Sequence, residues 1–338
     1  MRKGIRNIKH NSTKYRLVGR GGEGNVYEYD SDSNLAIKVY RTDSICYTDP
    51  DTFEKEIYVI RFLKDLPQVS AHIVDIFDLV PCSAPNEPRG YVMMELYDGD
   101  LDQWAKQATT KGTEVDEDHW ISMIFQIVFA FTEINKNGIL HGDSKPKNIF
   151  YTRRNLKDPN TDGIRSYLLD GKVVEIKYDT RFVLGDFSRV RIAELDPDYS
   201  KGLAGLGGSE DMYFDLTHRS DLYELSRLLY RVMVNSALRT YSEQKVENLV
   251  KHHSEINPAF KTRILQTEQE IKNMAVPSHI ENRMRLRMYL YELIESDYIT
   301  QEMLRDADPQ LVLPSERVQN ILQNIAEPDT DLFDLFNS

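Results

Sequence analysis

The first 95 residues carry a strand-like pattern and most of the later chain a helical one, and this contrast constrains the fold more than any other feature of the sequence. Residues 15–40 alternate between apolar and polar positions, with glycine-rich or turn-forming stretches between them, which predicts three short antiparallel strands. Residues 51–66 repeat apolar side chains every three or four positions and predict a helix. Residues 91–96 predict another strand.

Helical periodicity takes over after a short link at residues 97–100. Residues 117–136 form the clearest predicted helix, and the most apolar stretch within it, at 121–131, is too short to span a bilayer. A β-rich patch is expected at 148–190, and helices dominate from about 220 to 325. The pattern therefore predicts a soluble protein of the α+β class, with a small β-rich N-lobe and a larger helical C-lobe.

The composition narrows the classes of partner. The chain has 338 residues, and its 42 Lys and Arg stand against 54 Asp and Glu, a formal net charge of −12. This balance argues against a general nucleic-acid binder, because phosphate backbones select basic surfaces. Two cysteines, Cys46 and Cys82, cannot form a disulfide framework or a cysteine-rich zinc site. They indicate a reducing compartment, most simply the cytoplasm.

A glycine motif lies in the first predicted strands. Gly19, Gly21, Gly24 and Val26 fit the pattern G-x-G-x-x-G-x-V, and glycines allow the backbone to approach phosphates closely. A dinucleotide-binding fingerprint has the same glycines but leads into a helix, whereas a strand-like segment follows here. The context favours a glycine-rich hairpin over nucleotide phosphates, with a purely structural hairpin turn as the alternative.

A lysine lies inside the third predicted strand. Lys38 is surrounded by apolar residues, and burying a lysine is costly unless it meets an anion. Its expected partner is a carboxylate on the following helix. Glu56 is the better candidate because it directly precedes the apolar face, and Glu54 is the alternative. An edge-strand lysine that faces water remains the non-functional interpretation.

The segment at 139–150 reads Ile-Leu-His-Gly-Asp-Ser-Lys-Pro-Lys-Asn-Ile-Phe. Here the sequence resembles the eukaryotic-type serine/threonine protein kinase superfamily, whose catalytic loop reads H-R-D-L-K-x-x-N. The resemblance implies that Asp143 accepts or orients the proton of the substrate hydroxyl. It also implies that Lys145 neutralises the γ-phosphate and that Asn148 binds a metal ion. A bilobal protein-kinase-like fold is the expectation that follows.

Further positions follow from the same resemblance. Asp186 and Phe187 are similar to the start of the family's D-F-G, which makes Asp186 the principal Mg²⁺ ligand. Met94 would be the gatekeeper, while Glu95 and Tyr97 would offer hinge backbone groups to adenine. The remaining implied contacts are with the adenine ring, and with the ribose or a basic substrate residue: Val26, Ala36 and Asp100.

The sequence departs from the family in three places near the site. Gly142 replaces the catalytic-loop arginine that usually receives an activation-loop phosphate, so we expect no requirement for phosphorylation of that loop. Ser188 replaces the glycine after Asp-Phe and should disfavour flipping of this pair. Residues 201–216 contain no clear A-P-E, which leaves the substrate-docking loop unassigned.

A fourth departure is the long separation of Asn148 from Asp186, which holds an insert at about 152–183. Within it, residues 168–178 place two apolar strands around an Asp-Gly turn and predict a hairpin. A similar extended hairpin occurs in haspin-like kinases and in kinases encoded by large DNA viruses. The second resemblance suggests a viral lineage and, in that case, the host cytoplasm as the location.

The two ends of the chain differ in charge. Residues 1–14 form a basic tail, read as solvated, with a nuclear address or nucleic-acid contact as the alternative. Residues 326–338 alternate acidic and large apolar side chains, which favours folding back or disorder over a docking motif for a partner. The kinase lobes would span 15–94 and 95–325. His252 and the adjacent His253 are expected on a solvated helix surface.

The leading prediction is an ATP-dependent serine/threonine protein kinase that uses ATP and Mg²⁺. The first 22 residues carry seven positive charges, so the rest carries −19, which suits protein substrates with basic residues near the phosphosite. No membrane partner is expected. One alternative is a small-molecule kinase of the aminoglycoside or choline kinase type, which also carries His-Gly-Asp. The other is a nucleotide-binding pseudokinase scaffold.

Overall fold

The computed structural model describes residues 15–20, 24–29, 34–40, 51–67, 69–81, 90–153, 163–169, 171–193, 218–274, 276–327 and 330–337. They fall into two compact units. The first unit lies within 1–101 and 125–199, and the second lies within 102–124 and 200–338. Among the described residues, no helix has both the length and the apolar character needed to cross a membrane.

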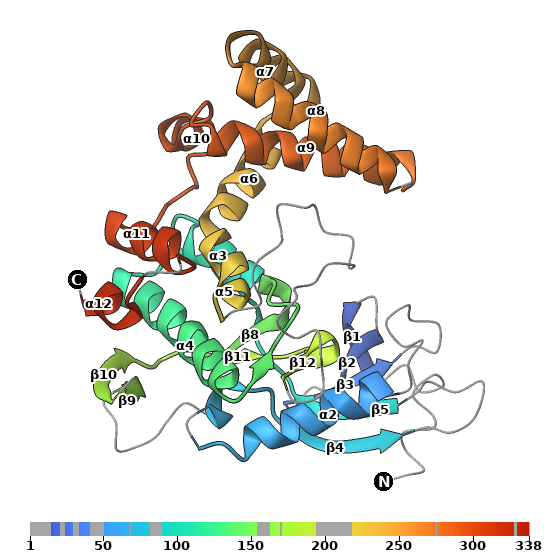
Figure 1. Cartoon of the computed structure of the whole chain (residues 1–338), viewed down its shortest axis with the longest axis vertical. Coiled ribbons are helices and arrows are strands. Elements are labelled where there is room, and N and C mark those ends of the chain that lie inside the picture. The colour runs from blue at the N-terminus through green and yellow to red at the C-terminus, as the bar shows by residue number, and fades with distance from the viewer. Residues whose placement is uncertain are drawn as a thin grey trace. The chain divides into compact units, whose positions relative to one another are not determined.

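The first unit contains a five-stranded antiparallel sheet (Figure 1), in the order β1-β2-β3-β5-β4. Its strands are β1 (Tyr15–Arg20), β2 (Gly24–Tyr29), β3 (Leu35–Tyr40), β4 (Ile76–Pro81) and β5 (Gly90–Glu95). The three strands expected across 15–40 and the strand near 91–96 are confirmed, whereas the sequence did not predict β4. The helix α2 (Asp51–Lys64) is also confirmed. Its Ile57 packs with Tyr40 and Val92 of the sheet in one buried cluster.

The rest of the first unit surrounds a three-stranded sheet and a short strand pair. The sheet has the order β11-β8-β6, and the pair joins β12 to β7. Their bounds are β6 (Gly99–Asp100), β7 (Ile139–Leu140), β8 (Ile149–Thr152), β11 (Arg181–Leu184) and β12 (Arg191–Ile192). The second half of α4 (Glu117–Lys136) supplies buried aromatic side chains here, and the bounds of this helix are those that the sequence predicted.

The predicted hairpin insert is present. β9 (Ile164–Leu169) pairs antiparallel with β10 (Lys172–Lys177), and the pair Leu169–Lys172 lies next to the turn. Gly171 has a φ of +80°, a backbone conformation that glycine adopts without the cost a side chain would add. One face is buried through Tyr167, Leu169, Val174 and Ile176, and the other exposes Leu168 and Val173. The hairpin formed by β9 and β10 is therefore a packed part of the first unit.

The second unit is helical, as the sequence predicted for residues 220–325. Its helices are α3 (Leu101–Ala108), α5 (His218–Ser226), α6 (Leu228–Thr240), α7 (Glu243–Ile256), α8 (Pro258–Asn273), α9 (Ser278–Glu295), α10 (Gln301–Ala307), α11 (Glu316–Asn324) and α12 (Leu332–Asn337), with the start of α4. α9 packs against α6, α7 and α8 (Figure 1). The C-terminal residues fold back, because α12 buries Leu335 and Phe336, and Arg317 donates a hydrogen bond to the Phe336 carbonyl.

The expectation that both histidines of α7 lie on a solvated surface is wrong for His253. Its side chain is only 7% exposed and lies between Phe260 and Tyr298, with a ring separation of 4.3 Å on each side. Burial lowers the pKa of His253, which favours the neutral imidazole. Phe260 of α8 and Tyr298, which follows α9, bury this position, and a local pattern in the sequence does not reveal such contacts.

Candidate active site

The Lys38 side chain meets two carboxylates in the first unit. Its Nζ lies 3.5 Å from Oε1 of Glu56 on α2 and 3.0 Å from Oδ1 of Asp186. Lys38 is 14% exposed, and Glu56 is only 2% exposed. The contact with Glu56 confirms the expected ion pair, whereas the side chain of Glu54 falls outside the described residues. A mostly buried lysine is thereby paired with the anions that its environment requires.

Tyr40 also contacts the Lys38–Glu56 ion pair, and the sequence did not predict this role. Its hydroxyl donates a hydrogen bond of 3.1 Å to Oε2 of Glu56, and its ring lies 4.6 Å from Nζ of Lys38. Burial, followed by the Glu56 charge, raises the pKa of Tyr40 well above its usual range, so the phenol remains a donor. The available signal was position, because residues two apart on one strand face the same side.

The predicted catalytic loop brings three polar side chains together between β7 and β8. Oδ2 of Asp143 accepts a hydrogen bond from Nζ of Lys145 and another, of 2.9 Å, from Nδ2 of Asn148. The same amide of Asn148 also reaches the Asp143 carbonyl at 2.8 Å. The short 3₁₀ helix η3 (Pro146–Asn148) begins at a proline and returns Asn148 toward Asp143. The carboxylate is thus oriented by two donors from its own loop.

His141 joins this loop to the segment that carries Asp186. Its ring is fully buried, and Nε2 lies 2.9 Å from the carbonyl oxygen of Gly185, so Nε2 is the donor. The Asp143 amide donates to Nδ1 at 3.3 Å. The His141 ring also lies 4.7 Å from the ring of Phe187, in line with the packing role implied for Phe187. Asp186 itself has a φ of +62°, in the left-handed region.

Gly142 lies where the chain leaves no room for a side chain. Its φ is +74°, and an added Cβ would lie 2.4 Å from the carbonyl oxygen of Arg189. Two observations fix this approach: β7 pairs with β12 through Leu140 and Arg191, and the Ala193 amide bonds to the Gly138 carbonyl at 2.8 Å. Glycine at position 142 is therefore a structural requirement of this backbone.

Ser188 lies in the short 3₁₀ helix η4 (Phe187–Arg189), which packs against α2. Its φ is not positive, so serine is accommodated there without strain. The predicted effect of Ser188 on flipping of the Asp-Phe pair stays a prediction. Residues 201–216, where A-P-E is missing, fall outside the described residues.

The three glycines of the G-x-G-x-x-G pattern differ in what the structure requires of them. An added Cβ at Gly24 would lie 2.3 Å from the Val39 carbonyl, which β2–β3 pairing brings close. At Gly19, an added Cβ would make only ordinary contact with Val26, at 3.6 Å. Gly21 falls outside the described residues. Close strand pairing therefore explains Gly24 without a ligand.

The predicted hinge residues lie at the end of β5 and just beyond it. Met94 pairs with Ala36 across β3 and β5, and Asp100 pairs with Phe150 across β6 and β8. The Tyr97 ring stacks on Phe150 at 5.5 Å. The Glu95 side chain is held within the unit by an ion pair described below. The adenine contacts predicted from Glu95 and Tyr97 involve backbone groups, and they stay predictions.

The oxygen donors of the site suit a hard cation only with help from a ligand. Among the described residues, no cluster of three or more His, Cys, Asp or Glu could hold a metal ion. Asp186 and Asn148 supply one carboxylate and one amide oxygen. Mg²⁺ commonly binds one or two carboxylates together with substrate phosphates. The donor set therefore fits Mg²⁺ bound with a nucleotide, not by the protein alone.

Comparison with known proteins agrees with this geometry. Residues 12–158 match the protein kinase domain family, a range that includes Lys38, Glu56 and the Asp143 loop. The chain has a protein kinase fold. The match ends before Asp186, so the Asp-Phe segment and the second unit lie beyond it.

Curated relatives of this kinase fold are distant. A probable serine/threonine-protein kinase, PknB, of Lactococcus lactis is 24% identical over 80% of the chain. The serine/threonine-protein kinase Pkn1 of Myxococcus xanthus is 33% identical over 43% of the chain. The dual specificity protein kinase Ttk of Danio rerio is 23% identical over 94% of the chain. The matched regions span 40%, 19% and 30% of these relatives' own lengths, respectively.

Proposed function

We propose that the chain is an ATP-dependent protein kinase that transfers the γ-phosphate of ATP to serine or threonine hydroxyls of proteins. The observation that carries this proposal is the position of Lys38 between Glu56 and Asp186. The oriented Asp143 carboxylate supports it within the same unit. Positioning and charge neutralisation are the main contributions that a protein makes to phosphoryl transfer.

In the proposed reaction, the oxygen of the substrate hydroxyl forms a bond to the γ-phosphorus. The bond between that phosphorus and the bridging oxygen of the β-phosphate breaks, and ADP leaves with the electron pair. The hydroxyl proton passes to the Asp143 carboxylate, which Asn148 and Lys145 orient through Oδ2. When Lys145 moves to the nucleotide, the hydrogen bonds from Asn148 would still hold Asp143 from within its own loop.

The two lysines would act on the phosphates. Lys38 would bind the α- and β-phosphates while Glu56 keeps its ammonium in place. Lys145 is 42% exposed and would move from Asp143 to the γ-phosphate. Asp186 and Asn148 would hold Mg²⁺, which supplies charge neutralisation on the phosphate oxygens when bound.

The proposed substrate class is protein, with serine or threonine as acceptor. Lys145 supports this acceptor through the family resemblance, as do the serine/threonine kinases among the relatives. The net charge of −19 beyond residue 22 supports a preference for basic residues near the phosphosite. A peptide array tests this preference, and selection of acidic peptides would contradict it.

The test of the function is γ-phosphate transfer from labelled ATP, measured in parallel on protein and small-molecule panels. We expect labelled phosphoserine or phosphothreonine in protein, and loss of the label with Asp143→Asn. Transfer to metabolites alone would identify a small-molecule kinase of the aminoglycoside or choline kinase type. ATP binding without transfer to any acceptor, the chain itself included, would identify a nucleotide-binding scaffold.

A further inference from the structure

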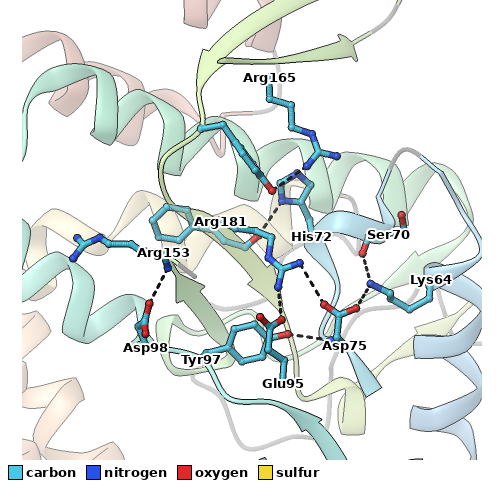
Figure 2. Close-up of polar contacts among 12 residues, drawn as sticks. Lys64, Ser70, His72, Asp75, Glu95, Tyr97, Asp98, Arg153, Arg165 and Arg181 are labelled. Carbon is cyan, nitrogen blue, oxygen red and sulfur yellow. Dashed lines mark hydrogen bonds and ion pairs between the residues drawn. The ribbon is translucent and has the colours of Figure 1, made fainter. Parts of the chain in front are cut away.

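Arg181, the first residue of β11, lies between two carboxylates from different parts of the first unit (Figure 2). Its Nη1 lies 3.3 Å from Oδ2 of Asp75, and its Nη2 is paired with Oε2 of Glu95. Asp75 just precedes β4, and Glu95 ends β5. Arg181 therefore connects the strand that leads to Asp186 with the proposed adenine-binding segment.

The backbone on both sides of Arg181 is fixed by buried side chains. The fully buried amide of Gln126, on α4, donates to the Thr180 carbonyl at 2.9 Å and accepts from the Phe182 amide at 3.0 Å. The carbonyl of Phe182, the residue after Arg181, lies 2.9 Å from Nδ1 of His72. The backbone position of Arg181 is thus fixed independently of the contacts that its side chain makes with Asp75 and Glu95.

Asp75 is itself tied to the proposed hinge and to α2. Its carbonyl accepts a hydrogen bond of 3.0 Å from the Glu95 amide, and its amide donates one of 3.0 Å to the Tyr97 hydroxyl. Oδ1 of Asp75 lies 2.6 Å from Nζ of Lys64, the last residue of α2. Asp75 therefore contacts both Arg181 and Lys64, and Lys64 belongs to the same helix as Glu56.

The charges in this cluster balance, with Lys64 and Arg181 against Asp75 and Glu95. Burial is the main cause that raises the pKa of Glu95; Asp75 adds to the effect, and Arg181 opposes it. Removing only the arginine would leave two carboxylates facing each other. Breaking one partner of a buried pair is costly because the remaining charge is uncompensated.

We propose that Arg181 is a positioning residue for nucleotide binding, which holds the segment after β5 at a fixed place relative to β4 and to the strand that leads to Asp186. This inference rests on the proposed function, since the segment it positions is the proposed adenine site. Arg181 contacts no reacting group. Its effect would pass through Glu95 and through the backbone bond between Glu95 and Asp75.

The test compares Arg181→Met with Arg165→Met in the full chain. Arg165, on β9, donates a hydrogen bond of 2.9 Å to the Tyr178 hydroxyl, and its guanidinium lies over the Tyr167 ring. It is therefore a matched arginine of the same unit whose partners are aromatic residues and not Asp75 or Glu95. Hydrogen exchange of the Glu95 and Leu96 amides needs no nucleotide. We expect about tenfold faster exchange in Arg181→Met. In Arg165→Met we expect exchange within twofold of the wild type.

The second readout is the dissociation constant for ATP with Mg²⁺, measured by calorimetry. We expect it to rise about tenfold in Arg181→Met, and to recover in part when Glu95→Gln removes the opposing carboxylate. If Arg181→Met does not fold, Arg181→Lys takes its place, with a smaller rise expected because lysine lacks the two-pronged donor.

Equal exchange at Glu95 and Leu96 in the two arginine variants would overturn the inference, as would faster exchange without a change in ATP affinity. Absence of ATP binding in the wild type would instead contradict the proposed function. The exchange measurement would then still decide whether Arg181 holds the segment after β5. The two failures are therefore distinguishable.

Discussion

Nζ of Lys38 lies 3.0 Å from Oδ1 of Asp186, although the two residues are 148 positions apart in the sequence. The same ammonium lies 3.5 Å from Glu56, so one cation serves two carboxylates. A triphosphate that enters the site would compete with both for this charge. The arrangement thus depends on whatever holds Glu56 in place, which leads to the first prediction.

Tyr40→Phe should weaken the site without removing any charge. The substitution removes the hydrogen bond to Oε2 of the buried Glu56, and loss of such a bond costs about 1–3 kcal/mol of unfolding free energy. We expect kcat for transfer to fall severalfold because the Lys38–Glu56 geometry loosens. Urea unfolding and steady-state kinetics measure both effects. Tyr58→Phe, at a position on α2 that is 63% exposed, is the control and should change neither.

Gly24→Ala should lower the unfolding free energy more than Gly19→Ala. A methyl at Gly24 meets the Val39 carbonyl at 2.3 Å, so β2 and β3 must separate, at a cost of about 1–3 kcal/mol in unfolding free energy. A methyl at Gly19 makes ordinary contact with Val26, and its cost should stay within about 0.5 kcal/mol. Thermal unfolding of the two variants measures the difference. Equal losses would show that the strand pairing at Gly24 is looser than described.

Phosphatase treatment should leave the transfer activity within twofold of the untreated protein. Gly142 offers no charged side chain to an activation-loop phosphate, and β7–β12 pairing already joins the start of that segment to the catalytic loop. The measurement is the initial rate before and after treatment, with removal of phosphate checked by mass spectrometry. Loss of activity that returns on rephosphorylation would contradict the prediction.

His72 should make the protein less stable in mild acid. Burial is the main cause that lowers its pKa from 6.5 to about 3, so between these values the unfolded chain binds a proton that the folded chain does not. The unfolding free energy should therefore fall as pH falls below about 6.5, by at most about 1.4 kcal/mol per pH unit from this group. Below about pH 3 the loss from this group is complete.

The measurement is urea unfolding between pH 5 and 7.5, compared with His72→Asn. Asparagine can still donate to the Phe182 carbonyl but does not titrate, although it loses the contact with Tyr167. The variant should be less stable at pH 7.5 and should show a shallower dependence on pH. An unchanged slope would show that His72 does not control this dependence.

Local pattern was sufficient for most elements of the fold. Strand alternation over 15–40, helical spacing over 117–136 and the Asp-Gly turn of the insert each reflect interactions between near neighbours in sequence, so they were predictable. β4 was not, because its short apolar run ends at Pro81 and becomes a strand only by pairing with β5. The same limit applies to His253, whose burial depends on Phe260 and Tyr298.

Contacts among the polar residues of the site were likewise predictable only where the partners lie close together in the sequence or in neighbouring predicted elements. Asp143 and Asn148 lie in one loop, and their contact follows from a spacing of five residues. The pairing of Lys38 with Glu56 was predicted because Glu56 directly precedes the apolar face of the helix expected after the lysine strand. Nothing in the local sequence around Arg181 indicates Asp75 or Glu95, which are 106 and 86 positions away. Such contacts arise from the topology, and a motif cannot contain them.

Gly142 also limits how this sequence can change over evolutionary time. Any side chain at this position would meet the Arg189 carbonyl, so Gly142→Arg alone would not fit the present backbone. The backbone at Arg189 would have to move first, and that backbone directly follows the Asp-Phe segment. A side chain at position 142 and the present path of the chain at Arg189 therefore exclude each other, so homologues with a larger residue at 142 should place the backbone after the Asp-Phe segment differently.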